Sequence, residues 1–260
     1  MKRFFSLIAL LVVCATGSVS AAAVADSQAA DRHDNDTLSV LCIGNSFTFF
    51  FDSEKRLEEI AASEGHGLKA QALTVGGYTF HRHLIDDKTM GPLVYNQYDL
   101  VFLQDQSRTP ALYGENPKCC HLVADDAREL AERVRIYSPH ARVWIEQTWS
   151  YENGNYGGFG SFERFDQLLK KGARLMAKKS HTEVSPIGDA FAIVRAERPD
   201  INLYYPDNKH QSELGTYLKS CVNYLLIYGQ PFSANTTSCG YDAEKCSFLR
   251  KVAERVVLGR

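Results

Sequence analysis

The 260-residue sequence lacks several features that would point to particular classes of protein. It has no internal repeat and no basic tract of the kind that marks nucleic-acid binding, so we expect no nucleic-acid partner. No apolar run reaches the roughly 20 residues needed to span a bilayer, so we expect no transmembrane segment in the mature chain. Charged residues make up 23% of the chain, hydrophobic residues 45%, and the formal net charge is −2. This balance is typical of one globular domain of ordinary core size.

The amino-terminal residues have the layout of an export signal. Lys2-Arg3 precedes an apolar run, and small residues follow that run. This order predicts a secretory signal peptide over residues 1–25, a polar lead-in over 26–36 that we expect to be disordered, and one folded domain over 37–260. We therefore expect an exported protein, either periplasmic or extracellular.

Six cysteines follow the predicted signal peptide, and an oxidising compartment would allow some of them to pair. Cys42 lies in an apolar strand pattern and Cys221 on an apolar helix face, so both are predicted to be free, packed thiols. The four cysteines in polar, turn-rich segments are the predicted disulfide formers, and their connectivity stays open: Cys119, Cys120, Cys239 and Cys246. The run Cys119-Cys120-His121 does not match the usual spacing of zinc ligands.

Short β-rich runs alternate with helical patterns along the rest of the chain. Five strands are predicted, at residues 38–43, 69–75, 99–103, 142–147 and 183–187. Apolar residues at helical spacing predict helices between and after them, at about 53–64, 123–137, 162–173, 214–228 and 242–257. Strands that alternate with helices imply βαβ units, so the prediction is an α/β protein: a three-layer α/β/α sandwich with a mainly parallel, five-stranded sheet.

Polar or glycine-rich segments follow the first three predicted strands directly. These segments are Asn45-Ser46, Gly76-Gly77 and residues 104–107. Ligands of such sheets bind at the carboxyl ends of the strands, so the three segments should meet at one edge. Near the end of the chain, Asp207 and His210 offer a carboxylate and an imidazole three residues apart. A serine needs a base and the base needs an orienting acid, so these residues together predict an activated serine nucleophile.

These blocks, together with Thr148-Trp149, resemble those of the SGNH (GDSL-like) hydrolase superfamily, in particular an exported bacterial branch with Gly-Asn-Ser at the nucleophile. The resemblance implies a flavodoxin-like SGNH hydrolase fold. It implies Ser46 as the nucleophile, His210 as the general base and Asp207 as the acid that orients the base. It also implies an oxyanion hole built from the Ser46 N–H, a glycine N–H and a side-chain amide, with Gly77 favoured over Gly76.

The third block departs from the family's pattern. Where the family commonly has Gly-x-Asn-Asp, this chain reads Gln104-Asp105-Gln106-Ser107. Aligning the blocks places Gln106 at the asparagine position, so Gln106 is the predicted amide donor. The glutamine side chain is longer than that of asparagine, so neighbouring residues must fix the direction of its amide group. The choice between Gln104 and Gln106 stays open.

Two further groups of residues have a functional and a structural interpretation. Trp149 and Tyr151 open a segment in which aromatic residues interleave with glycine and asparagine. They could form an aromatic wall that binds a sugar ring or an acyl chain, or they could be core residues of an ordinary loop. His81 and His83 could reach the site or bind a metal, but a solvated helix start is the favoured interpretation.

The sequence as a whole favours an exported serine esterase that hydrolyses carboxylic esters through an acyl-enzyme, with acetyl or acyl esters of carbohydrate as the favoured substrates. A lipase- or thioesterase-like ester hydrolase is one alternative, and a non-catalytic carbohydrate-binding protein on an SGNH scaffold is another. We expect no metal and no organic cofactor, because serine, histidine and backbone donors suffice for acyl transfer. The expected partner is a small-molecule or carbohydrate ester, and the oligomeric state stays open.

Overall fold

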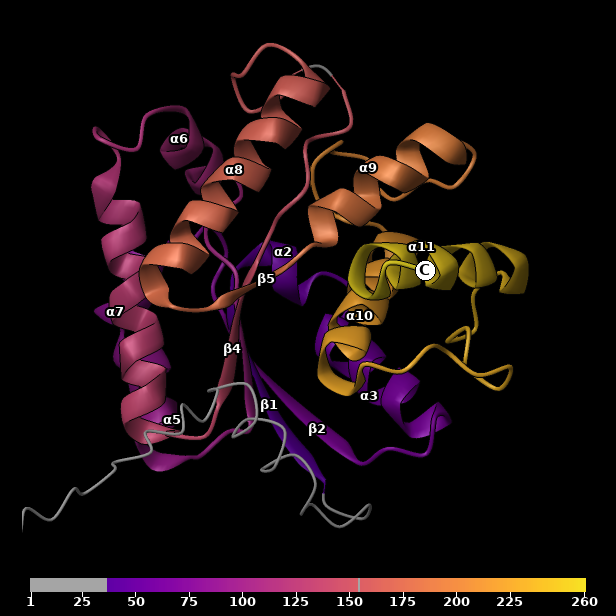
Figure 1. Ribbon diagram of the computed structural model, residues 1–260, viewed down its shortest axis with the longest axis horizontal. Coiled ribbons are helices and arrows are strands. Elements are labelled where there is room, and N and C mark those ends of the chain that lie inside the picture. The colour runs from indigo at the N-terminus through magenta and orange to yellow at the C-terminus, as the bar shows by residue number, and fades with distance from the viewer. Residues whose placement is uncertain (1–36, 154) are drawn as a thin grey trace, which may run out of the picture. The chain divides into compact units, whose positions relative to one another are not determined.

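A five-stranded sheet lies between two layers of helices (Figure 1). The computed structural model describes residues 37–153 and 155–260. The strands, in chain order, are β1 (Leu38–Gly44), β2 (Leu68–Thr74), β3 (Leu100–Leu103), β4 (Arg142–Glu146) and β5 (Glu183–Ser185). They are arranged β2-β1-β3-β4-β5, and every neighbouring pair is parallel. The predicted three-layer fold and its five strands are therefore confirmed, whereas the predicted signal peptide and lead-in lie outside the described residues.

The helices divide between the two faces of the sheet (Figure 1). One face is covered by α3 (Ser53–Ser63), α9 (Ile187–Glu197), α10 (Glu213–Tyr228) and α11 (Ala243–Leu258). The other face is covered by α4 (Phe80–Leu84), α5 (Asp87–Tyr95), α7 (His121–Tyr137) and the C-terminal half of α8 (Phe162–Ser180). Two short helices, α2 (Ser46–Phe49) and α6 (Thr109–Glu115), follow the carboxyl ends of β1 and β3.

Both faces of the sheet are apolar, because successive side chains of a strand point to opposite sides. In β1, Val40 and Cys42 pack in the core that includes α3 and α10. Leu41 and Ile43 pack in the other core, which includes α5 and α7. All four are buried. This two-sided burial explains why the strand reads as a continuous apolar run rather than an alternating one.

The ends of α10 follow ordinary capping chemistry. Ser212 precedes the helix, and its hydroxyl accepts a hydrogen bond from the N–H of Gly215. Gly229 ends the helix with a left-handed φ of 67°. Asp207 and His210 lie in the loop just before this cap.

The cysteine predictions are partly wrong. Cys42 and Cys221 are free, buried thiols, as predicted. The four cysteines predicted to form disulfides are also free. The Sγ of Cys246, for example, is buried against the carbonyl oxygen of Ser238, 3.8 Å away. A polar, turn-rich pattern shows where the chain turns but not which turns meet in space, and that is why the pairing prediction failed.

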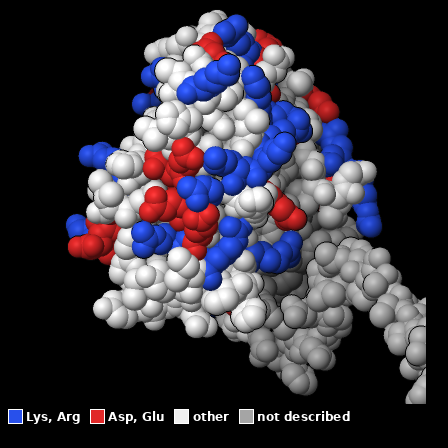
Figure 2. All heavy atoms as spheres, turned by 60° about the vertical axis from the view of Figure 1, so that its left-hand side comes forward, with Lys and Arg blue, Asp and Glu red and all other residues white. Residues whose placement is uncertain are grey.

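The outer face of the helical layer that contains α7 has charges of both signs. Figure 2 shows basic and acidic side chains interspersed on this side of the molecule. On α7, Arg128 pairs with Glu132 and Arg133 pairs with Glu129, with N–O distances of 2.9 and 3.2 Å. Such pairs one turn apart are typical of a solvated helix face. Within residues 37–153 and 155–260, no helix combines the length and the apolar character that crossing a membrane would require.

Candidate active site

Ser46, His210 and Asp207 form one hydrogen-bonded row at the carboxyl edge of the sheet. The Nε2 of His210 lies 2.7 Å from the Oγ of Ser46, and its Nδ1 lies 2.5 Å from the Oδ2 of Asp207. Ser46 is the first residue of α2, directly after β1. Ser46 and His210 are 164 residues apart in the sequence, so only the fold brings them into contact.

The loop that carries Asp207 and His210 is closed by its own backbone. The Tyr205 N–H donates to the His210 carbonyl at 2.8 Å, and Asn208 has a left-handed φ of 62°. The Oδ1 of Asp207 accepts hydrogen bonds from the N–H groups of Lys209 and His210, which leaves Oδ2 for the imidazole. Burial acts to raise the pKa of Asp207, but the hydrogen bonds from His210 and the backbone outweigh it and hold the pKa below its ordinary value. Asp207 is therefore ionised at neutral pH.

Aromatic rings hold the imidazole of His210 in place. Phe50 stacks on it with ring centroids 4.3 Å apart and an interplanar angle of 6°. Phe47 packs against it at 5.1 Å and 54°. The His210 side chain is 14% exposed, so it stays partly accessible while these rings fix its orientation.

The turn before Ser46 is fixed by Asn45 and Gln104. The Asn45 N–H donates to the Oε1 of Gln104 at 2.9 Å. The Asn45 side chain caps α2 by accepting from the Phe47 N–H, and its Nδ2 donates to the carbonyl of Tyr78. Asn45 therefore ties the turn before Ser46 both to the end of β3 and to the loop after β2.

Gly44 and His83 support the same turn from the other side. A Cβ on Gly44 would lie 2.4 Å from the Oγ1 of Thr48 and 2.7 Å from the Oε1 of Gln104, so any larger residue here would displace the two side chains that support the turn. The Nε2 of His83 donates to the Gly44 carbonyl at 2.9 Å, and its Nδ1 accepts from the hydroxyl of Thr89. Burial lowers the pKa of His83, which keeps it neutral.

The solvated position expected for the two histidines is therefore wrong for His83, which is fully buried, and right for His81, which is exposed. The role of His83 was missed because its partner, the Gly44 carbonyl, lies 39 residues earlier in the chain. No local sequence signal marks such a contact.

The predicted oxyanion donors lie at different parts of the carboxyl edge. The Ser46 N–H is the first of α2, where helix N–H groups lack intrahelical acceptors. Gly77 lies in an exposed turn after β2, with a left-handed φ of 72°. The geometry leaves both N–H groups as candidates and does not link Gly77 to Ser46 by a contact.

The two glutamines after β3 differ in surroundings. Gln104 is 1% exposed, and its Oε1 accepts hydrogen bonds from the Asn45 N–H and from the Thr48 hydroxyl, on either side of Ser46. Gln106 is half-buried, and its Oε1 accepts from the Arg108 N–H. Because the Oε1 of Gln104 already accepts hydrogen bonds inside the fold, Gln106 is the better candidate for an amide that faces a ligand.

Asp105 lies between these glutamines and is buried. Its Oδ1 accepts hydrogen bonds from the N–H groups of Phe80 and Gln106, at 2.9 and 2.8 Å. These bonds act to lower its pKa, but burial is the larger effect and raises the pKa to about 7. Asp105 therefore changes protonation near neutral pH while it joins the end of β3 to the start of α4.

Trp149 does not fit the substrate-binding position expected from the sequence. It is 1% exposed, and its indole is stacked between Phe47 and Phe191, with centroid distances of 4.8 and 4.3 Å. Its Nε1 donates to the carbonyl of Lys209, in the loop that carries His210. Both faces of the ring are covered, so Trp149 supports the site from within the core.

Tyr151, the other residue of the predicted aromatic wall, is half-buried at the same edge. Its hydroxyl lies 2.8 Å from the Oγ of Ser107, and its ring meets Phe165 edge-on at 5.1 Å. Burial raises the pKa of the Tyr151 hydroxyl, so it stays protonated. Tyr151 remains a candidate for contact with a ligand.

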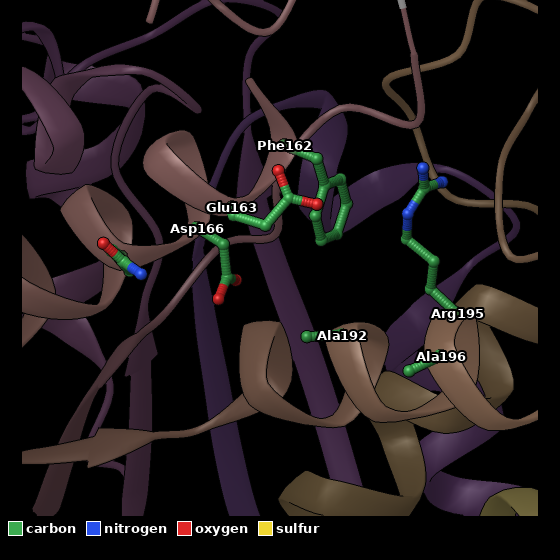
Figure 3. A pocket seen from close by; sticks show the side chains of 7 residues that line it. Phe162, Glu163, Asp166, Ala192, Arg195 and Ala196 are labelled. Carbon is green, nitrogen blue, oxygen red and sulfur yellow. The ribbon is translucent and has the colours of Figure 1, made fainter. Parts of the chain in front are cut away.

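A cavity of about 410 Å³ lies elsewhere, between α8 and α9 (Figure 3). Its lining residues include Asp166 and Arg195, and none of them belongs to the hydrogen-bonded row. Burial raises the pKa of Asp166 to about 6, and the Arg195 guanidinium lies over the ring of Phe162 at 4.3 Å. This cavity is separate from the Ser46 site.

Known proteins resemble this chain in structure rather than in sequence. No family model and no curated protein matches the sequence. Among solved structures, a DUF4886 family protein from Bacteroides uniformis has a TM-score of 0.72 and 19% identity, covering 86% of this chain and 95% of the other. A proposed SGNH hydrolase from Slackia heliotrinireducens has a TM-score of 0.59 and 22% identity, over 74% of this chain and 100% of the other.

An acetylxylan esterase from Geobacillus stearothermophilus is also similar, with a TM-score of 0.53 and 14% identity, over 79% of this chain and 100% of that enzyme. At these identities the similarities establish the fold. The chain therefore shares the SGNH-like α/β fold of these proteins.

Proposed function

We propose that this protein is a serine ester hydrolase in which Ser46 is the nucleophile, His210 the general base and Asp207 the residue that orients the base. The observation that carries the proposal is the row of hydrogen bonds from Ser46 Oγ through the imidazole to Asp207 Oδ2. A serine in contact with an imidazole, which is in turn held by an ionised carboxylate, has the parts needed for acyl transfer.

The reaction would proceed in two halves. Ser46 Oγ attacks the ester carbonyl as its proton passes to His210 Nε2, and the carbonyl oxygen becomes an oxyanion. His210 then donates this proton to the leaving alcohol, which leaves an acyl group on Ser46. In the second half, His210 takes a proton from water, the resulting hydroxide attacks the acyl carbon, and the proton returns to Ser46. Asp207 stays ionised and stabilises the imidazolium in both halves.

The proposed oxyanion donors are the N–H groups of Ser46 and Gly77 and the Nε2 of Gln106. Such donors act on charge that develops only in the transition state, and the loss of one typically costs about 10²–10³ in rate. The proposal is supported by the position of all three residues just after parallel strands, at the edge where ligands of this fold class bind.

We propose carbohydrate acetyl or acyl esters as the substrates. Phe49 and Tyr205 are 38% and 43% exposed, and Phe50 joins them to His210, since it packs at 5.6 Å from Phe49 and 5.5 Å from Tyr205. The leaving alcohol departs on the side where His210 delivers its proton. These rings would therefore contact the alcohol part of the ester, and an aromatic face suits the C–H face of a sugar ring. The similarity to an acetylxylan esterase fold supports the same substrate class.

The test is hydrolysis of p-nitrophenyl acetate, its longer-chain esters and an acetylated xylo-oligosaccharide by the wild type, Ser46→Ala and Ser161→Ala. Ser161 is the matched control, because it also starts a helix but lies outside the hydrogen-bonded row. We expect Ser46→Ala to lose at least about 10³-fold in kcat/KM, while Ser161→Ala keeps wild-type activity. Full activity in Ser46→Ala would contradict the assignment of the nucleophile.

The same assay separates the alternatives. A rate that rises with acyl chain length would favour a lipase- or thioesterase-like enzyme. Binding of the oligosaccharide without hydrolysis, by both the wild type and Ser46→Ala, would favour a carbohydrate-binding protein on this fold. We also propose that the protein is exported after cleavage near residue 25, and the amino-terminal sequence of the secreted protein tests this.

A further inference from the structure

A buried lysine lies beneath the helix that carries Ser46. Lys219, in α10, is 1% exposed, and its Nζ lies 2.6 Å from the Oε2 of Glu146 at the end of β4. The same Nζ donates to the carbonyl of Phe47 at 3.1 Å and to the Oγ1 of Thr48 at 3.4 Å. Phe47 and Thr48 are the two residues that follow Ser46. The ammonium group therefore uses all three of its protons, and two of them go to α2.

Glu146 is the counter-charge of this lysine and has its own supports. It is 2% exposed, and its Oε1 accepts from the Nδ2 of Asn223 at 2.8 Å. The Oδ1 of Asn223 accepts in turn from the hydroxyl of Ser185 at 2.8 Å. Burying a charged pair is costly, and apolar or neutral residues often fill the same space with no loss of stability. The pair is therefore not explained by stability alone, and its contacts with α2 point to a role at the site.

The helix α2 depends on such contacts, because it has only four residues and cannot be stable by itself. Its carbonyl groups are held by the segment that begins directly after His210. The Nε2 of Gln211 donates to the carbonyls of Phe47 and Phe50, at 3.2 and 3.4 Å. The hydroxyl of Thr216 donates to the carbonyl of Phe50 at 3.2 Å. One continuous segment thus carries the imidazole and also holds the helix that carries the serine.

The contact between Lys219 and Thr48 extends to the turn before the nucleophile. The hydroxyl of Thr48 donates to the Oε1 of Gln104, which also accepts from the Asn45 N–H. A chain of polar contacts therefore runs from Glu146 through Lys219 to both ends of the nucleophile turn.

We propose that Lys219 is a positioning residue that sets the distance between Ser46 Oγ and His210 Nε2 by holding α2 against α10, with Glu146 as its counter-charge. This inference rests on the proposed function, because it assigns Lys219 a role in serine ester hydrolysis. Lys219 contacts no substrate and acts through the backbone of Phe47 and the hydroxyl of Thr48. A displacement of about 1 Å at the reacting atoms is enough to lower the rate about 10²-fold.

The informative variant is the double substitution Lys219→Met/Glu146→Gln. Lys219→Met alone would leave a buried, unpaired carboxylate and could unfold the protein. The double variant removes both charges, fills similar space and keeps a side-chain oxygen for Asn223. Ser185→Ala is the matched control, because it shortens the same polar network at the end that does not touch α2.

We expect the double variant to fold, with a cooperative thermal transition, and to lose about 10²-fold in kcat on p-nitrophenyl acetate with KM little changed. Ser185→Ala should stay within twofold of the wild type. A folded double variant with wild-type kcat would overturn the proposal, and so would an equal loss in Ser185→Ala.

Crystal structures of the wild type and the double variant add a readout that does not depend on activity. We expect the distance between Ser46 Oγ and His210 Nε2 to exceed hydrogen-bond reach in the double variant, from 2.7 Å in the native chain. An unchanged distance would overturn the positioning role. Failure of the proposed function is a different result, in which the wild type itself hydrolyses no ester.

Discussion

Asp105→Asn should make the protein more stable at pH 8 while leaving its stability at pH 4 nearly unchanged. The Oδ1 of Asp105 accepts from the N–H groups of Phe80 and Gln106, and the amide oxygen of an asparagine can accept both bonds. The substitution therefore keeps both backbone hydrogen bonds and removes the ionisation. Asp105 joins the end of β3 to the start of α4, so its protonation affects the carboxyl edge of the sheet, where the candidate site lies.

The direction in which stability changes with pH follows from the direction of the pKa change. Burial raises the pKa of Asp105 from 3.8 to about 7 in the folded protein. Between these values the folded state holds the proton more tightly than the unfolded state, so wild-type stability falls as the pH rises from about 4 to about 7. Each pKa unit corresponds to 1.36 kcal/mol, so the whole effect is about 4 kcal/mol. An asparagine has no such proton to lose, and the variant should escape this loss.

The measurement is urea unfolding of the wild type and Asp105→Asn at pH 4 and pH 8, with free energies of unfolding from linear extrapolation. The difference between the two proteins at each pH cancels the contribution of the other titrating groups. We expect this difference to be close to zero at pH 4 and to reach several kcal/mol in favour of the variant at pH 8. A difference that is the same at both pH values would refute the reasoning.

Three further predictions follow from other parts of the site and the core. Asp207→Asn should lower kcat by about 10⁴-fold at neutral pH, because an amide holds the His210 imidazole in the wrong tautomer; steady-state kinetics that show less than a tenfold loss would speak against the assigned role. Trp149→Phe should lower kcat with little change in KM, because it loses the hydrogen bond to the Lys209 carbonyl that supports the loop; a rise in KM alone would instead indicate contact with substrate. In the native protein a thiol reagent should modify Cys119, which is exposed, and should reach the buried cysteines only after denaturation; a count of free thiols that stays low in denaturant would mean that disulfides exist.

Local patterns in the sequence predicted the sheet and most of the long helices, but they missed α9, and the predicted fifth strand ran to residue 187, where α9 begins. Short β-rich runs between helical patterns predicted each of the five strands, and their alternation with helices predicted a mainly parallel sheet. The helix after His210 was visible from its apolar stripe and its terminal Gly229. These features depend on residues close together in the chain, since the period of a strand or a helix repeats within a few positions.

The position of the candidate site was also accessible from the sequence. Ser46, Gly77 and Gln106 each follow a strand directly, and parallel strands end at the same edge. Their placement at one edge of the sheet is a consequence of topology, which the strand pattern already contains.

Contacts between distant segments were decided only by the tertiary structure. The sequence around Trp149 allowed either an exposed aromatic wall or a ring packed in the core. Its ring is stacked between those of Phe47 and Phe191, so it is packed in the core. Similarly, Lys219 reads in the sequence as one polar residue of a mostly apolar helix, and nothing local shows that it meets Glu146, 73 residues earlier. Periodicity determines which face of an element is buried. Which side chains from different elements touch depends on packing of the whole chain, and that is why the free cysteines, the packed ring of Trp149 and the lysine beneath α2 appear only in the folded protein.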